Sequence, residues 1–343
     1  MITAPPLPAQ AARRLPGVDT ARWQELWRDS IRDPRELLSL LGLDQLAGSL
    51  SAQAEEQFPL RVPRGFAARM RHGDRHDPLL RQVLPVLEED RIEPGFSLDA
   101  VGDGAARGAT GVLHKYQGRA LLVATGSCAV HCRYCFRRHF PYADETAAAN
   151  DWSEAVAYLS ADPSISEVLL SGGDPLSLST RKLADLTGQL RHLPQLRRLR
   201  LHTRLPVVLP ERVDQELTDW LGALPWPVSV VIHANHGNEI DETVVAALAR
   251  LREAGATLLN QSVLLRGVND DADTLAELSC RLFDAGVLPY YLHQLDRVAG
   301  AAHFEVDDPS ALELVATLQS RLPGYLVPRL VREIAGAGSK TAL

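Results

Sequence analysis

The chain has 343 residues, of which 45% are hydrophobic and 23% charged, and its formal net charge is −7. This composition excludes a disordered chain, the four cysteines are too few for a secreted disulfide scaffold, and the acidic balance disfavours a nucleic-acid binder. No apolar run reaches the ~20 residues of a membrane helix, and prolines interrupt the N-terminal stretch where a signal peptide needs an apolar core. We therefore expect a cytoplasmic protein with no membrane and no nucleic-acid partner.

Residues 1–110 differ in pattern from the rest of the chain. Amphipathic helical segments, clearest from Trp23 to Leu43, are broken by prolines, and a stretch rich in Gly and Ala from Asp99 to Thr110 is typical of a connecting loop. The sequence therefore predicts an N-terminal, mainly helical region at 1–110 and a second region at 111–343.

From Arg119 onward, short apolar runs alternate with helical patterns. The expected strands are Ala120–Ala124, Glu167–Leu170, Arg198–His202, Val228–His233, Thr257–Leu264 and Pro289–His293. The expected helices lie near 151–160, 179–192, 211–222, 241–254 and 271–285. Asp151 with Glu154 has the spacing of a capping box, and Gly255 is placed as a helix stop. Six such repeats predict parallel strands with right-handed crossovers, an α/β fold that forms a partial (β/α)6 barrel.

In such a barrel the active site lies at the C-terminal ends of the strands. The chemically unusual residues of this chain follow or end a predicted strand, except for Gln261, which lies within the fifth one: Cys128, Cys132 and Cys135, Gly172, Gly173 and Asp174, Arg204, His233 and Asn235, Gln261, and Asp296. Taken alone, the Gly-Gly-Asp-Pro sequence is an ordinary turn, although paired glycines also let a ligand approach the backbone closely.

The loop Cys128-Ala-Val-His-Cys132-Arg-Tyr-Cys135 places three thiols within eight residues. Three thiolates fit an iron–sulfur cluster with one iron left open, whereas four would close it. Zinc is the alternative, with His131 or His139 as fourth ligand, but the chain lacks the second ligand pair of a structural zinc site. Cys280 stands in an apolar helical pattern and is expected to be a buried core residue.

Only three of the 36 basic residues are lysines: Lys115, Lys182 and Lys340. A lysine can form an imine with a carbonyl compound and an arginine cannot, so a lysine retained after a Gly-rich run, as Lys340 is, becomes a candidate nucleophile. Lys182 fits a solvated helix start. Lys115, Tyr116 and Arg119 are compatible with a site for a phosphate and a ring, and equally with a solvated strand edge.

Together these motifs resemble the lysine 2,3-aminomutase family of radical S-adenosylmethionine (SAM) enzymes. The resemblance covers about residue 110 to the C-terminus and rests on CAVHCRYCFRRHFPY at 128–142, SGGDPL at 171–176, TRLPVVLP at 203–210, NQSVLLRGVND at 260–270, PYYLHQLD at 289–296 and GSK at 338–340. Within the family the chain is most similar to the short bacterial branch that makes (R)-β-lysine for the modification of elongation factor P.

The resemblance implies roles for individual residues. Cys128, Cys132 and Cys135 would hold a [4Fe–4S] cluster whose open iron binds SAM, and the SAM contacts would be Gly172, Gly173, Asp174, His233 and Gln261. Lys340 would bind pyridoxal 5′-phosphate covalently, with Lys115, Tyr116 and Arg119 near that cofactor. Arg137 would pair with the substrate carboxylate, and Asp296 and Glu333 with the distal ammonium of lysine. The clostridial-type pattern has an aspartate at the position of Glu333, which keeps the charge but has a longer side chain.

The implied activity is an isomerase that converts (S)-α-lysine into (R)-β-lysine by a radical 1,2-amino shift. Its implied partners are L-lysine, an electron donor such as flavodoxin or ferredoxin, and a functional link to elongation factor P and its lysyl-ligase. Two alternatives stay open at this point. One is a radical SAM aminomutase acting on glutamate or ornithine, and the other is a non-catalytic adaptor stabilised by zinc.

Overall fold

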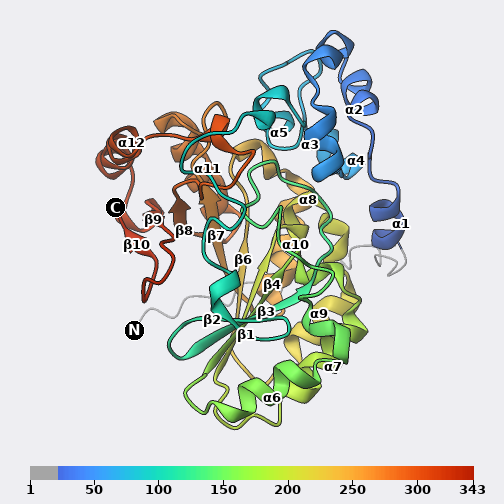
Figure 1. The fold of residues 1–343 in the computed structure, drawn as a ribbon, viewed down its shortest axis with the longest axis vertical. Coiled ribbons are helices and arrows are strands. Elements are labelled where there is room, and N and C mark those ends of the chain that lie inside the picture. Colours follow the sequence, from blue (N-terminus) through green and yellow to red (C-terminus); the bar gives the residue numbers. More distant parts are fainter. Residues whose placement is uncertain (1–21) are drawn as a thin grey trace, which may run out of the picture.

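The structure is a computed structural model that describes residues 22–343. The N-terminal part consists of short helices, of which those between residues 34 and 81 gather at one end of the molecule (Figure 1). They are α1 (Arg22–Arg28), α2 (Pro34–Leu40), η1 (Asp44–Ser49), α3 (Ala52–Gln57), α4 (Arg64–Ala67), α5 (Pro78–Arg81), η2 (Leu87–Asp90) and η3 (Gly104–Ala106), where η denotes a 3-10 helix. The continuous pattern expected from Trp23 to Leu43 is therefore two helices. Asp33 caps the second one by accepting from the Arg35 N–H, and Pro34 occupies its first turn, where proline is tolerated.

In the described residues, ten strands form one sheet in the order of the sequence (Figure 1). They are β1 (Arg107–Ala109), β2 (Val112–Tyr116), β3 (Arg119–Thr125), β4 (Glu167–Gly172), β5 (Arg198–Thr203), β6 (Val228–Ile232), β7 (Thr257–Val263), β8 (Leu288–His293), β9 (Arg329–Arg332) and β10 (Thr341–Ala342). Strands β3 to β9 run parallel, while β1, β2 and β10 are antiparallel additions at the two edges. The six expected strands are confirmed as β3 to β8.

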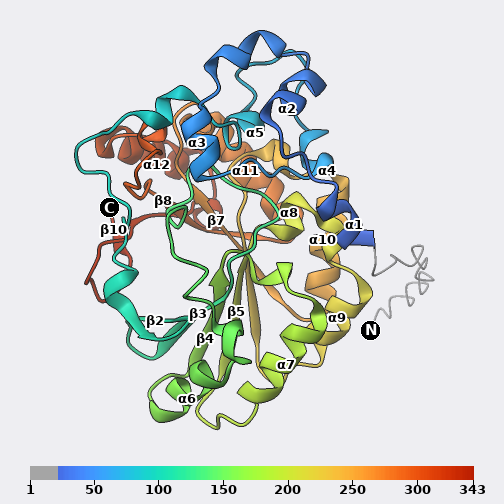
Figure 2. The same cartoon turned by 45° about the vertical axis from the view of Figure 1, so that its right-hand side comes forward.

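The crossovers between the parallel strands are helical and lie along the outside of the sheet (Figure 2). They contain α6 (Ser153–Ala161), α7 (Thr180–Leu190), α8 (Leu205–Val208), α9 (Gln215–Gly222), α10 (Glu242–Glu253), α11 (Ala272–Asp284) and α12 (Asp308–Arg321). These six strand–helix units confirm the α/β class and the partial (β/α)6 barrel. The sequence analysis missed α12, the closing strand β9 and the strands at both edges.

Two local predictions are wrong, and one is confirmed. Helix α6 begins at Ser153 without a side-chain cap from its N-cap residue Trp152. Asp151 and Trp152 are both left-handed, with φ of 50° and 67°, and Trp152 is buried in the core, so burial of the indole rather than a capping box sets the start of this helix. Cys280 is exposed, because Leu275, Leu278 and Leu282 form the buried face of α11. Gly255 does follow the end of α10 with a φ of 93°.

The N-terminal helices and the barrel share one core. Buried Trp23, Leu37 and Phe66 belong to the same apolar cluster as Leu122 of β3 and Val230 of β6. The boundary near residue 110 stays a prediction. Within the described residues, no helix combines the length and apolar character needed to span a membrane.

Candidate active site

One pocket at the C-terminal ends of the parallel strands contains every residue that the sequence analysis assigned to a cofactor or a substrate. It encloses about 320 Å³ and is lined by Lys115, Tyr116, Arg119, Cys128, Cys132, Cys135, Arg137, Gly172, Gly173, Asp174, His233, Gln261, Asp296, Glu333 and Lys340. Its wall comes from β2 to β5, β7 and β8, from the loops that follow the strands, and from the segment after β9. The fold therefore assembles the candidate residues, although they lie up to 225 positions apart.

The three cysteines of the loop after β3 are free thiols, each half-buried on this wall. Burial raises the pKa of Cys135 to about 11, and the neighbouring Cys132 adds to the increase. Burial likewise raises the pKa of Cys128, with Cys135 as the next contribution. Across residues 22–343, no three His, Cys, Asp or Glu side chains stand ready to enclose a metal ion as they are oriented here. The donor set nonetheless fits an iron–sulfur cluster, because three neighbouring thiols lie on one buried wall and a metal centre deprotonates such thiols.

Gly172 and Gly173 pack directly against the backbone that leads into the cysteine loop. A Cβ at position 172 would lie 2.7 Å from the Thr125 carbonyl oxygen, and one at position 173 would lie 2.5 Å from the Ser127 carbonyl oxygen. The Gly173 N–H also donates to Thr125 over 2.7 Å. These contacts require glycine on packing grounds, and the role of the pair in binding SAM stays a prediction.

Asp174 is occupied by hydrogen bonds from the chain itself. Its buried carboxylate accepts from the Thr203 hydroxyl at 2.7 Å and from the backbone N–H groups of Leu176, Arg204 and Leu205 at 2.7–3.0 Å. Burial raises its pKa, and these hydrogen bonds oppose the increase. Asp174 therefore holds the end of β5 against the glycine turn, and its direct contact with SAM stays a prediction.

Arg204 was placed at a strand end by the sequence but given no role. Its guanidinium donates to the Cys132 Sγ at 2.6 Å, to the Tyr134 hydroxyl at 2.7 Å and, through Nη2, to Glu239 at 2.8 Å. Asn235, at the end of β6, also donates to the Tyr134 hydroxyl at 2.7 Å. A buried cation thus lies against one thiol of the cysteine loop.

The N-terminal helices hold the cysteine loop from the other side. Glu89 of η2 accepts hydrogen bonds from Arg133 at 2.7 Å and from Arg138 at 2.7 Å, and all three side chains are almost fully buried. Arg133 lies between two cysteines and also donates to the backbone carbonyls of Ala54 and Phe58. No local pattern marks Glu89 as the partner, because 44 positions separate it from Arg133.

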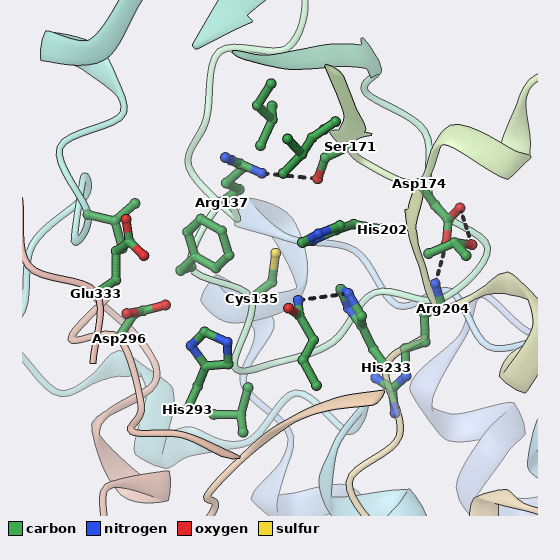
Figure 3. A pocket seen from close by; sticks show the side chains of 18 of the residues that line it. Cys135, Arg137, Ser171, Asp174, His202, Arg204, His233, His293, Asp296 and Glu333 are labelled. Carbon is green, nitrogen blue, oxygen red and sulfur yellow. Dashed lines mark hydrogen bonds between the residues drawn. The ribbon is translucent and has the colours of Figure 1, made fainter. Parts of the chain in front are cut away.

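Three histidines, the buried His293 and the half-buried His202 and His233, line the middle of the pocket (Figure 3). His233 hydrogen-bonds Gln261 through Nε2 at 2.9 Å, and burial, aided by the charges of Arg204 and Lys340, lowers its pKa to about 3. Burial also lowers the pKa of His202 and of His293, and the Nε2 atom of each has no hydrogen-bond partner in the described part of the chain. The sequence analysis missed His202 and His293, although His293 ends β8 and His202 is the penultimate residue of β5. All three rings are neutral near pH 7 and available as hydrogen-bonding groups.

Glu333, in the segment after β9, connects the residues predicted to surround pyridoxal phosphate. Its carboxylate accepts from the Lys340 ammonium at 3.0 Å and from the Tyr116 hydroxyl, and it lies 3.9 Å from the Lys115 ammonium. Burial acts to raise its pKa, but Lys340 and these hydrogen bonds lower it overall. The Arg119 guanidinium stacks over the Tyr116 ring at 4.5 Å. The donor set fits a phosphorylated ring, since two cations, Lys115 and Arg119, and the phenol of Tyr116 line this wall together with Lys340.

Charged groups of opposite sign mark two parts of the pocket (Figure 3). Arg137 is buried and hydrogen-bonded to Asp103 at 2.6 Å and Ser171 at 3.4 Å. Asp296 and Glu333 form the acidic part. Burial raises the pKa of Asp296 to about 7; Lys340 acts to lower it and Glu333 to raise it.

The fold and the cysteine loop define a radical SAM enzyme, and comparison with known proteins agrees. The Radical SAM superfamily profile matches residues 122–278. The chain is 50% identical to the L-lysine 2,3-aminomutase of Escherichia coli strain K12, over 94% of each chain. It is 46% identical to the Haemophilus influenzae protein of the same name, over 93% of this chain and 94% of that one. The corresponding protein of Clostridium subterminale is 33% identical, over 93% of this chain and 76% of that one.

The chain belongs to the lysine 2,3-aminomutase family of radical SAM enzymes. Membership of the superfamily implies a [4Fe–4S] cluster and SAM. It also removes the alternative of a non-catalytic zinc adaptor.

Proposed function

We propose that this enzyme converts (S)-α-lysine into (R)-β-lysine with a [4Fe–4S] cluster, SAM and pyridoxal phosphate. The observation that carries the proposal is the pocket itself, where the three thiols, Lys340, a buried arginine and two carboxylates share one cavity. Few other reactions need a thiol-rich metal site and an imine-forming lysine next to a binding site for an amino acid with a cationic side chain.

When bound, the cluster with SAM supplies a radical able to remove hydrogen from an unactivated carbon, and pyridoxal phosphate carries the amino group that migrates. The chain would hold these parts together in one pocket. Cys128, Cys132 and Cys135 would ligate the cluster, and the neutral Gln261–His233 pair would hydrogen-bond SAM. Gly172, Gly173 and Asp174 would complete that site, since their turn is packed on the cysteine loop.

The residues around Lys340 would bind the second cofactor. Lys115 and Arg119 supply positive charge for a phosphate, and Tyr116 supplies a ring and a hydroxyl. In the structure the Lys340 ammonium pairs with Glu333. A cofactor held by Lys340 would take this amine out of its pair with Glu333, which would leave the Glu333 carboxylate available to the distal ammonium of the substrate.

Substrate length would be measured by charge at both ends. Arg137 would bind the carboxylate, while Asp296 and Glu333 would bind the distal ammonium through charge-assisted hydrogen bonds. Two carboxylates disfavour glutamate, whose side chain carries the same charge. Ornithine keeps the charge but is one methylene shorter, and so it cannot satisfy both ends equally.

We also propose that the product supplies β-lysine for modification of elongation factor P by its lysyl-ligase, and that flavodoxin or ferredoxin supplies the electron. The support is the resemblance of the motifs to the short bacterial branch. Mass spectrometry of elongation factor P from cells with and without the gene tests the pathway.

The activity is tested by anaerobic assay of the reconstituted enzyme with lysine, ornithine and glutamate, and we expect a β-isomer from lysine alone. Lys340→Ala should lose the pyridoxal absorbance and turnover but keep the cluster spectrum. Lys182→Ala is the matched control, because Lys182 is exposed on α7. Turnover by Lys340→Ala would refute the assignment.

A further inference from the structure

Asp103 is a buried carboxylate that lies between two cations of the pocket. It is 2% exposed, its Oδ2 accepts from the Arg137 Nε at 2.6 Å, and its Oδ1 lies 2.7 Å from the Lys115 ammonium. Neither the motifs nor the comparisons assign it a role, and the sequence predicted only a connecting loop from Asp99 to Thr110. We propose that Asp103 is a positioning residue, which orients Arg137 for the carboxylate of the substrate.

The geometry of the guanidinium carries this inference, which rests on the proposed function. A guanidinium is planar, so a bond at Nε together with a stacking partner fixes its plane. The Phe136 ring lies 4.7 Å from the Arg137 guanidinium carbon, and Nη1 reaches Ser171 at 3.4 Å. Nη2 has no hydrogen-bond acceptor among residues 22–343, so that donor is free for a ligand in the pocket. Asp103 thus holds the side of the guanidinium that is not needed for binding.

The loop that carries Asp103 is itself held firmly. The Asp99 carboxylate accepts from the backbone N–H groups of Asp103 and Gly104, both at 2.9 Å. Gly102 has a φ of 69°, and a Cβ there would lie 2.9 Å from the Ala335 Cβ, two positions after Glu333. The Lys115 ammonium also donates to the Val101 carbonyl at 2.8 Å. The loop therefore aligns Arg137 with the segment that carries Glu333 and Lys340.

The ion pairs also determine the charge that a substrate meets. Asp103 offsets part of the positive charge that Arg137 and Lys115 bring to this part of the pocket. Burial acts to raise the pKa of Asp103, but Arg137 and Lys115 lower it overall, so this carboxyl group stays ionised at neutral pH.

The test is the binding of lysine and of 1,5-diaminopentane, which lacks the carboxylate, to the anaerobic holoenzyme by calorimetry. In Asp103→Ala we expect lysine to bind about 10–100-fold more weakly, which is the usual loss when a residue that orients a ligand-contacting side chain is removed. The affinity for diaminopentane should change less than about twofold. Asp103→Asn keeps the shape and loses the charge, so we expect an intermediate loss. Asp273→Asn, which breaks the exposed pair with Arg321, is the control and should match the wild type.

Three outcomes separate the possibilities. Equal weakening of both ligands together with a lower unfolding temperature would mean that Asp103 only supports the fold, which overturns the proposal. An unchanged preference for lysine in both variants also overturns it. A wild-type enzyme that binds lysine but forms no β-lysine refutes the proposed function, whereas the binding ratio still decides the role of Asp103.

Discussion

Replacing Gly173 by alanine should dislodge the cysteine loop. The added Cβ would lie 2.5 Å from the Ser127 carbonyl oxygen and 2.8 Å from the Gly126 carbonyl carbon. Both are backbone atoms just before Cys128, so no side-chain rotation relieves the contact. Overpacking of this kind costs about 1–3 kcal/mol. Gly173 is a cleaner test than Gly172, whose φ of 108° would add backbone strain to the steric contact.

The measurement is the iron and sulfide content after anaerobic reconstitution, with the thermal unfolding temperature of the same samples. Since the displaced backbone leads directly into Cys128, Gly173→Ala should hold less iron per chain and unfold at a lower temperature. Pyridoxal phosphate should still attach at Lys340, because that residue enters the pocket from the segment after β9. Retained attachment would show that the fold as a whole survives.

The control is Gly188→Ala in helix α7. Gly188 is exposed, and a Cβ there meets nothing within 4 Å. Alanine in a helix interior is about 0.5–1 kcal/mol more favourable than glycine, so this variant should be at least as stable as the wild type and hold the same iron. If Gly173→Ala matches this control in both iron and stability, the explanation by close packing is wrong.

Two further predictions concern buried carboxylates. Glu89→Gln leaves Arg133 and Arg138 without their shared anion, and breaking buried ion pairs costs about 3–5 kcal/mol. The iron content and the unfolding temperature of this variant should therefore both fall. The control is Glu36→Gln, which breaks an exposed ion pair and should change neither. Because burial raises the pKa of Asp296 to about 7, the KM for lysine should fall as the pH rises from 6 to 8, and Asp296→Asn should remove this dependence. This carboxyl group binds its proton more tightly in the folded state than in the unfolded chain, so its contribution to the stability of the fold decreases as the pH rises from about 4 to 7. If the KM of Asp296→Asn still rises at acidic pH, the assignment of Asp296 to the substrate ammonium is refuted.

The barrel was predictable because its strands carry a local signal. The runs that became β3 to β8 are rich in leucine and β-branched residues and are bounded by turns. Strand β9 has only the four residues Arg329–Arg332, too few to show a period, and α12 buries only Ala311 and Leu318 of its fourteen residues, which leaves little amphipathic pattern. Both elements owe their structure to packing against β8 and α11 rather than to their own sequence.

The candidate site was predictable where its chemistry is local. Three thiols in one loop and a lone lysine after glycines are recognisable from residue type and spacing alone. Asp103 and Glu89 were not, since each is an ordinary acid in a polar segment, 34 and 44 positions before the arginine that it holds. What identifies them is burial together with two cations on one carboxylate, and both properties exist only in the folded chain.

The open edge of the sheet explains why so many of these charges converge. Strands β1 and β10 are the two edges and form no ladder with each other in the described residues. Side chains connect the two sides instead, because Tyr116 and Lys115 of β2 reach Glu333 beyond β9 and Gly102 packs on Ala335. The groups proposed to bind the cofactor and the substrate therefore also join the barrel at this edge. A cofactor held by Lys340 would take its amine out of the pair with Glu333, and this would change the contacts that hold the two edges together as well as the surroundings of Glu333 in the pocket.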